Sequence, residues 1–272
     1  MTISDTSALV LNWTSKNIWK SKKAQDYFAG LDLSAADILF RTFNEREKSM
    51  HTQAVSNRKF FVRKCAVEFL ERCKSESVIG QVIILAAGIA PLSVEVASLY
   101  PENPVFDVDK YLMNDKEKYL NNLCPNINFI DCDVTDIELL EEKLVEKGWN
   151  NRLPGLLIIE GITYYLTEKD LRNVLLFFAK SNAELVCDFG LKPECVNETN
   201  RGYGVEVFRK IKESIGLEFL TFYEPEYYMS LVKQCGFHHP ERFTMGDIQM
   251  ERTGERSPFD DKEPGWAALV RS

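Results

Sequence analysis

The segment Gln81-Val-Ile-Ile-Leu-Ala-Ala-Gly-Ile-Ala90 is the most informative part of this 272-residue chain, because four consecutive apolar residues lead directly into a turn of small residues. A short apolar run of this kind predicts a strand buried in a parallel sheet. The turn lets the backbone come close to a ligand, and Gly88 can adopt a positive φ there. A buried strand and a tight turn without a ligand would explain the same ten residues.

A second short strand is predicted at Pro104-Val-Phe-Asp-Val-Asp109, and it ends in acids. In doubly wound sheets a carboxylate about 20 residues after the turn binds ribose hydroxyls. The turn has one glycine where the dinucleotide fingerprint has three, so no cradle for a pyrophosphate is expected. S-adenosylmethionine, which has a ribose and no phosphate, therefore fits better than NAD, and an NAD-linked dehydrogenase is the less supported alternative.

Apolar runs alternate with helical segments after Val78, which predicts a mostly parallel sheet with right-handed crossovers. The expected strands are Val82–Leu85, Val105–Val108, Ile127–Cys132, Leu156–Ile159 and Leu185–Cys187. Residues 1–77 are predicted as a helical N-terminal extension and residues 78–272 as the catalytic domain. Within that domain, residues 191–228 form an insertion after strand five that covers the carboxyl ends of the strands. Arg242–Met245 and Trp266–Arg271 are expected to form an antiparallel hairpin joined by a loop without a crossover helix.

Composition limits the partners and the compartment. The formal net charge of −8 argues against nucleic acid and against an anionic membrane surface as partners. No run approaches the roughly 18 apolar residues of a membrane span. None of the seven cysteines lies in a C-x-x-C motif or at metal-ligand spacing from a histidine, so reduced thiols of a cytoplasmic protein and no metal site are expected. The oligomeric state is left open.

The segment from Leu153 to Glu168 is the second informative one. A buried strand ends at the carboxylate of Glu160, aromatic residues follow, and a helix is expected to begin at Thr167. A carboxylate at this edge of the sheet faces the ligand crevice and can hold a cationic amino group. The alternative is that Glu160 only ends the strand and that Tyr165 only packs.

Several further polar residues have competing explanations. Arg58 and Arg63 lie on one predicted helix and suit bidentate binding of carboxylates, although a solvated charged face would have the same pattern. Asp136 is expected to cap a helix, because leucines follow it at helical spacing. His238 and His239 are expected in a surface turn.

Together these segments resemble the leucine carboxyl methyltransferase family, a branch of the class I S-adenosylmethionine-dependent methyltransferases that includes bacterial polyketide-type O-methyltransferases. The resemblance runs from about Asn57 to Phe237 and is most specific from Leu153 to Thr167. It implies a Rossmann-like class I fold with seven strands, the last two antiparallel. It also implies a cofactor site made by Arg63, Ala86, Gly88, Asp107, Asp109, Asp133, Val134 and Glu160.

The sequence departs from the family pattern at the cofactor turn. Ala86, Ala90 and Pro91 stand where the family has glycine, aspartate and threonine, and Lys59 replaces the glycine of the arginine-containing helix. These departures imply weaker cofactor binding or its loss. A protein that binds S-adenosylmethionine without catalysis is therefore one alternative.

The favoured function is O-methylation of a carboxylate on a small molecule. A carboxylic acid with a pKa of about 4 is already ionised at neutral pH, so the reaction needs no general base. Tyr165, Arg58 and Tyr203 are the candidate catalytic residues, with Tyr165 as a wall of the pocket and Arg58, Tyr203 or Arg201 orienting the acceptor. A protein C-terminal carboxylate is the alternative acceptor, and a phenol would require a base such as His238 or His239.

Overall fold

A single seven-stranded sheet organises the chain. The structure, a computed structural model, describes residues 5–111, 113–120, 122–196, 198–216, 219–259 and 267–272. The strands lie in the order β3-β2-β1-β4-β5-β7-β6, with bounds β1 Gln81–Leu85, β2 Val105–Asp109, β3 Ile127–Asp131, β4 Gly155–Ile159, β5 Ala183–Gly190, β6 Glu241–Thr244 and β7 Ala267–Arg271. The first five strands are parallel and β7 is antiparallel to both of its neighbours. The predicted Rossmann-like, mostly parallel sheet is confirmed.

The central strand shows why these sequences form buried strands. All five residues of β1 are buried, and alternate side chains enter two different hydrophobic cores: Ile84 packs in one and Ile83 in the other. A strand covered on both faces is apolar throughout, because neither set of alternating side chains meets water. The β1 segment therefore lacks the polar alternation of a half-exposed strand.

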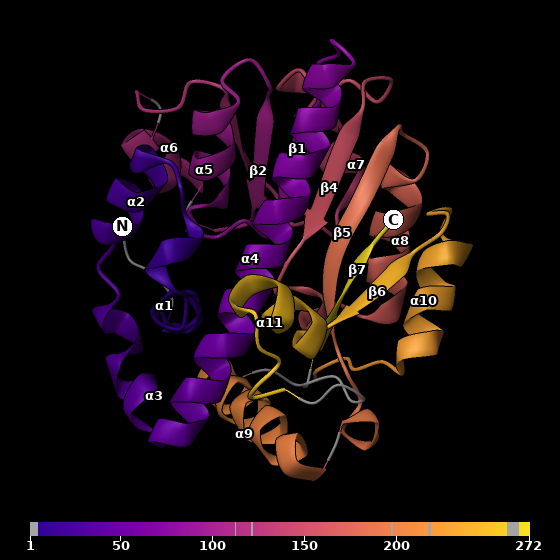
Figure 1. The fold of residues 1–272 in the computed structure, drawn as a ribbon. Helices are drawn as coiled ribbons and strands as arrows, with labels where there is room; N and C mark the ends of the chain where they lie inside the picture. The colour runs from indigo at the N-terminus through magenta and orange to yellow at the C-terminus, as the bar shows by residue number, and fades with distance from the viewer. Residues whose placement is uncertain (1–4, 112, 121, 197, 217–218, 260–266) are drawn as a thin grey trace.

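Helices cover both faces of the sheet (Figure 1). The Ile84 face packs against the N-terminal helices, the long α4 and helices from later in the chain: α1 Asp5–Asn12, α2 Lys22–Ala29, α3 Asp37–Arg41, α4 Glu45–Ser75, α5 Leu92–Leu99, α6 Met113–Leu120, α9 Glu198–Ile215 and α11 Met245–Thr253. The Ile83 face packs against α7 Ile137–Glu146, α8 Glu168–Phe178 and α10 Pro225–Gln234. No helix in the described ranges is long and apolar enough to cross a membrane.

Local capping explains where several helices begin. Asn44 and Glu47 form a capping box at the start of α4, and this 31-residue helix then crosses one face of the sheet. Asp136 accepts a hydrogen bond from the Leu139 N–H and caps α7, as predicted. Thr167 caps α8 in the same way, so the predicted start of that helix is also confirmed.

The C-terminal strands pair antiparallel as expected, but the connection between them was predicted wrongly. It contains α11, because Thr244 and Asp247 form a capping box and Gly254 ends the helix with a φ of 82°. Met245, expected in a strand, is the first residue of this helix. Trp266 lies outside the described residues.

The segment after β5 supplies a helix at the carboxyl ends of the strands. In Figure 1, α9 lies at the lower end of the sheet, beside α3. The last residues of the 191–228 range belong to α10 instead, and Tyr228 stacks on Phe189 of β5 with 4.0 Å between ring centroids. The insertion at the sheet edge therefore ends before α10 begins at Pro225.

Candidate functional site

The turn after β1 is held from two sides. Ala86 and Gly88 both have a left-handed backbone, with φ of 52° and 50°. The Gly88 N–H donates to Asp109 Oδ2 at 2.9 Å, and Lys116 Nζ donates to the Gly88 carbonyl at 3.0 Å. An acid from β2 and a cation from α6 thus fix the conformation of this turn.

Asp109 lies beside the turn with acceptor capacity left over. Its Oδ1 accepts the Tyr111 N–H at 3.0 Å, so each carboxylate oxygen holds one backbone N–H. A carboxylate oxygen accepts up to two hydrogen bonds, which leaves room for a hydroxyl. Burial raises the pKa of Asp109 above its ordinary value, although the two N–H groups act in the opposite direction.

Asp107 is placed differently from Asp109. It is fully buried, and its Oδ2 lies 2.6 Å from Nζ of Lys116, which is also fully buried. The Lys116 ammonium neutralises this buried charge, whereas Asp107 Oδ1 has no hydrogen-bond partner in the described chain. Lys116, which the sequence analysis did not single out, therefore links β2 to the carbonyls of the turn.

Glu160 is enclosed by two cations of α4. Its Oε1 lies 2.8 Å from Arg58 Nε and 2.9 Å from Lys59 Nζ, and about 6% of its side chain is exposed. Burial alone would raise the pKa of Glu160, but Lys59 and Arg58 outweigh it and hold that pKa below its ordinary value. Glu160 is therefore an ionised carboxylate whose partners are side chains.

Arg58 also binds a second acid. Its Nη1 lies 3.2 Å from Asp188 Oδ2, and Asp188 accepts the Gly161 N–H at 2.7 Å and the Tyr164 hydroxyl. Asp188 is fully buried, and burial raises its pKa even though Arg58 lowers it. The guanidinium of Arg58 thus joins α4 to β5 and to the loop after β4.

The other residues assigned by the resemblance have partners of their own. Arg63 Nε lies 2.5 Å from Oε1 of the buried Glu95, which also accepts the Lys20 and Ser21 N–H groups. Asp133 holds the Thr135 N–H and hydroxyl and lies 3.2 Å from Lys110 Nζ, while Val134 is buried.

Two of the three candidate catalytic residues are aromatic. Tyr165 packs against the Ile84-side core, and burial raises its pKa to about 12. Tyr203, on α9, lies under the guanidinium of Arg46 at 5.2 Å from the ring centroid. Neither residue lines the two cavities described next.

A small cavity lies between the turn and Glu160. Its volume is about 20 Å³, and it is lined by Lys59, Glu160 and Asp107 together with the turn residues and the start of α5. Ser93 also lines it with a side-chain hydroxyl that is buried and lacks a hydrogen-bond partner in the described chain. The space is polar and holds about one water molecule.

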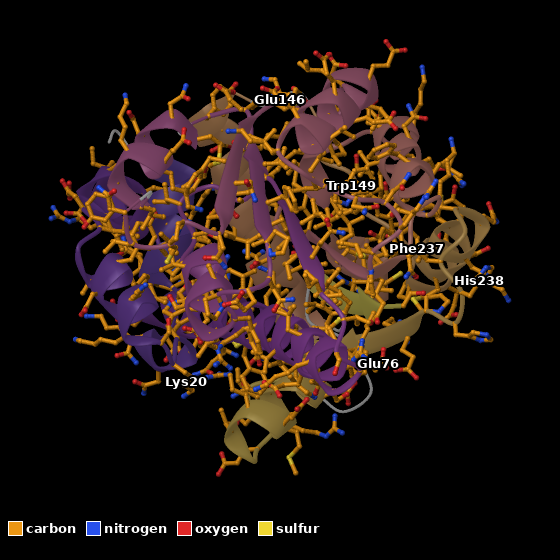
Figure 2. The ribbon with its side chains drawn as sticks, turned by 90° about the horizontal axis from the view of Figure 1, so that it is seen from above. Lys20, Glu76, Glu146, Trp149, Phe237 and His238 are labelled. Carbon is orange, nitrogen blue, oxygen red and sulfur yellow. The ribbon has the colours of Figure 1, made fainter. Side chains whose placement is uncertain are left out.

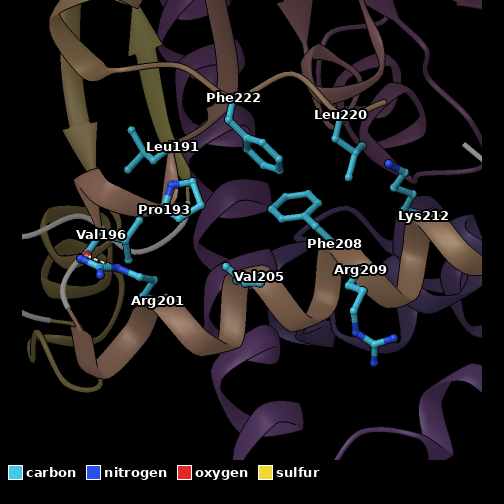
Figure 3. A pocket seen from close by; sticks show the side chains of 11 residues that line it. Leu191, Pro193, Val196, Arg201, Val205, Phe208, Arg209, Lys212, Leu220 and Phe222 are labelled. Carbon is cyan, nitrogen blue, oxygen red and sulfur yellow. Dashed lines mark hydrogen bonds between the residues drawn. The ribbon is translucent and has the colours of Figure 1, made fainter. Parts of the chain in front are cut away.

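A larger cavity lies beside α9. Its volume is about 310 Å³, and Figure 3 shows Phe208 and Phe222 facing each other across it, with Arg201 and Lys212 toward opposite ends. Leu191, Pro193, Val196, Val205 and Leu220 complete an apolar wall. The dimensions and lining suit a small molecule with an apolar body.

An aromatic wall borders the larger cavity. The Tyr164 ring lies 5.1 Å from that of Phe208, which lies 5.0 Å from Phe222. Because the Tyr164 hydroxyl binds Asp188, the wall of the larger cavity is joined through Arg58 to Glu160. One chain of contacts therefore runs from the larger cavity to Glu160, which lines the smaller one.

The histidines lie elsewhere. Figure 2 shows His238 at the margin of the molecule, across from Lys20, whose N–H binds Glu95 near the cofactor turn. The His238 carbonyl accepts the hydroxyl of the C-terminal Ser272. The structure does not bring His238 to either cavity.

The polar groups at this edge of the sheet match S-adenosylmethionine, but the volume of the small cavity does not. Asp109 and the backbone of the turn suit a ribose, and Glu160 suits an ammonium group. However, a cavity of about 20 Å³ cannot hold the methionine part of the cofactor. The Lys59 side chain fills the space next to Glu160.

The comparisons with known proteins agree with the fold. A solved structure of a candidate methyltransferase from Thermobifida fusca YX has a TM-score of 0.59 and 16% identity, over 95% of this chain and 93% of that chain. An O-methyltransferase family protein from Burkholderia thailandensis has a TM-score of 0.51 and 11% identity, over 82% of this chain and 59% of that chain. No curated protein matches the sequence.

One family model covers most of the chain up to the end of α8. It is the leucine carboxyl methyltransferase model, which matches residues 12–179. The match includes the turn after β1, Asp109, the α4 cations and Glu160, and it ends before β5 and the α9 cavity. Since more than half of the sequence is matched, the chain belongs to the leucine carboxyl methyltransferase family, whose cofactor is S-adenosylmethionine.

Proposed function

We propose that the protein transfers a methyl group from S-adenosylmethionine to a carboxylate on a small, largely apolar molecule. The observation that carries this proposal is the cavity of about 310 Å³ beside α9, which combines an apolar wall with a cation. Family membership supports the methyl transfer, and the cavity supports the class of acceptor.

Lys212 is the group best placed to recognise the acceptor carboxylate. Arg201 donates to the Val196 carbonyl, and Arg209 pairs with Glu206 and Glu213. By contrast, no acid of the described chain lies within ion-pair distance of Lys212. The ammonium of Lys212 is thus available for an anionic ligand, while Phe208 and Phe222 enclose its apolar body.

On the cofactor side we assign four recognition roles. Asp109 accepts hydrogen bonds from the ribose hydroxyls, because each of its oxygens has acceptor capacity left. Glu160 attracts the amino group of the methionine part, and Asp133 lies after β3, where it meets the adenine end. Arg63 serves the methionine carboxylate with the guanidinium N–H groups that are not bound to Glu95.

The residues of this chain act by positioning. The cofactor supplies a methyl group on a sulfonium, and an ionised carboxylate accepts it without a general base. Burial raises the pKa of Tyr165 to about 12, far above neutral pH, so its hydroxyl can donate a hydrogen bond but cannot act as a base. Holding two reactants in line lowers the barrier by roughly 7–11 kcal/mol. The role of the aromatic wall and of α9 is to hold the acceptor in that position.

The test is a methyl-transfer assay with radiolabelled cofactor and a panel of aryl and alkyl carboxylic acids, with matched phenols as the comparison. We expect transfer to at least one acid class and none to the phenols. Lys212→Met should raise the acceptor KM about tenfold with little change in kcat, because it removes a charge that binds the ground state. Lys169→Met, an equal charge change at an exposed position of α8, is the control.

A second candidate is a protein that binds S-adenosylmethionine without turnover. The turn after β1 favours it, since Ala86, Ala90 and Pro91 offer no polar side chain to orient a bound cofactor. Cofactor binding in calorimetry, combined with no transfer to any acid or phenol, would establish this candidate and reject the first.

A further inference from the structure

Lys59 occupies the interior of the cofactor site. Its side chain is about 7% exposed, its Nζ lies 2.9 Å from Glu160 Oε1, and it lines the small cavity together with Ala86 and Ala90. A long cationic side chain therefore fills the space between the turn after β1 and Glu160.

The surroundings of Lys59 indicate that the space serves a ligand. The buried Ser93 hydroxyl, which lines the same cavity, has no partner in the described chain. An unsatisfied buried hydroxyl is uncommon in native proteins and calls for an explanation. The start of α5 also faces this space, and its N-cap residue Pro91 gives it no side-chain cap. The Ser93 hydroxyl and the start of α5 thus both face the cavity of about 20 Å³, where a ligand would supply their missing hydrogen-bond partners.

Both size and charge set Lys59 against the cofactor. Sites for ligands of this size have volumes of about 300 Å³ or more, so the methionine part needs the space that Lys59 fills. S-adenosylmethionine carries an ammonium and a sulfonium, both positive like Lys59. All of these cations seek the same carboxylate, Glu160.

Resting on the function proposed above, we propose that Lys59 is a built-in competitor of the cofactor: it pairs with Glu160 in the free protein and must leave for S-adenosylmethionine to bind. Cofactor affinity is thereby reduced by the cost of displacing one side chain. Lys59 thus sets how much cofactor is needed to load the enzyme.

The neighbouring cation, Arg58, remains in place when Lys59 leaves. Arg58 is held by both Glu160 and Asp188, whereas Glu160 is the only acid of the described chain within ion-pair distance of Lys59. Burial also lowers the pKa of Lys59, although Glu160 acts in the opposite direction. Removing Lys59 still leaves Glu160 with a guanidinium partner, so we expect the fold to tolerate the change.

Isothermal titration of the full chain with S-adenosylmethionine and S-adenosylhomocysteine tests this proposal. We expect Lys59→Ala to bind both ligands about tenfold tighter than the natural chain. This gain corresponds to a binding-competent state that is populated in about one-tenth of the natural chain, because apparent affinity is reduced by the fraction of competent protein. Lys59→Met, which keeps the volume and removes the charge, should fall between the two. Lys64→Ala is the matched control, because Lys64 lies on the same helix and pairs with Glu251 outside the site.

The outcomes separate the two proposals. If the natural chain binds and Lys59→Ala binds no tighter while remaining folded, Lys59 is not a competitor, but the proposed function stands. If neither chain binds either ligand, the proposed function and the role of Lys59 are both wrong. The double variant Lys59→Ala with Asp109→Ala should bind no tighter than the natural chain. If it binds as tightly as Lys59→Ala alone, the ligand lies elsewhere and the competition is overturned. If Lys59→Ala does not fold, Lys59→Met decides, and affinity equal to that of the natural chain then overturns the proposal.

Discussion

Asp109 and Glu160 lie at the same edge of the sheet, yet they are held in opposite ways. The oxygens of Asp109 accept backbone N–H groups from Gly88 and Tyr111. Glu160 is bound by the side-chain cations of Arg58 and Lys59. A backbone donor cannot leave without unfolding its turn, whereas a lysine side chain leaves by rotating about single bonds.

The difference divides the site into a fixed half and an adjustable half. We expect the ribose side, at Asp109, to change little on binding. Under the competition proposed for Lys59, the methionine side opens only when the ion pair between Lys59 and Glu160 breaks. We therefore expect cofactor affinity to be decided at Glu160, although both carboxylates lie at strand ends.

The largest difference between the halves should appear in stability. Asp188→Ala is expected to lower the free energy of unfolding by about 3 kcal/mol or more, because it removes a buried partner of Arg58 and the acceptor of Tyr164 and Gly161. Asp109→Ala should cost only about 1 kcal/mol, since its two N–H partners lie near solvent. Urea unfolding of both variants makes the comparison, and equal losses would mean that the Arg58 network is not the more rigid structure.

A smaller effect is expected in acid, with opposite signs at the two carboxylates. The pKa of Glu160 is lowered in the folded protein, so its contribution is complete above the ordinary pKa of 4.5 and is lost as the pH falls below it. The pKa of Asp109 is raised, so its ionised form weakens the fold, and that penalty disappears as the pH falls through the folded-state pKa toward 3.8. A tenfold change in the acid dissociation constant on folding corresponds to roughly 1.4 kcal/mol of stability.

Urea midpoints at pH 7, 5 and 4 test these signs. Glu160→Gln should lose less stability than the natural chain on going from pH 7 to pH 4. Asp109→Asn should lose more, because the relief at Asp109 is missing. If the urea midpoint changed with pH equally in both variants, neither acid would have the shifted pKa that its contacts indicate. Other titrating groups cancel, since each variant is compared with the natural chain.

The strands and their acidic ends were predictable because they depend on local sequence. The apolar run at β1, the acid that ends β2 and the acid that follows β4 fix which residues reach the carboxyl edge. The capping box at Thr244 and Asp247 is also local, and it is the sequence signal that predicts α11.

The partners of those acids were not predictable. Arg58 and Glu160 are 102 residues apart, and Arg58 and Asp188 are 130 apart. Which face of α4 meets which strand end depends on packing of the whole sheet, and no local pattern encodes it. Lys116 gave no signal at all, since a lysine in a charged helix is ordinarily solvated. Asp188, an acid inside an apolar strand, was the one visible clue to this network.

The smallest expected effect is at the turn between the two halves, where Ala86 has a left-handed backbone. Ala86→Gly should stabilise the protein by up to about 1 kcal/mol, because relief of the strain exceeds the extra freedom of glycine in the unfolded chain. Gly88→Ala, at a φ of 50°, should destabilise by a similar amount and serves as the reverse control. Ala86 also lines the cavity beside Glu160. Cofactor affinity therefore distinguishes whether Lys59 or the Ala86 methyl group keeps this cavity small. If Lys59 is what closes the cavity, Ala86→Gly alone leaves cofactor binding unchanged in calorimetry; tighter binding would instead assign part of the closure to the alanine methyl group.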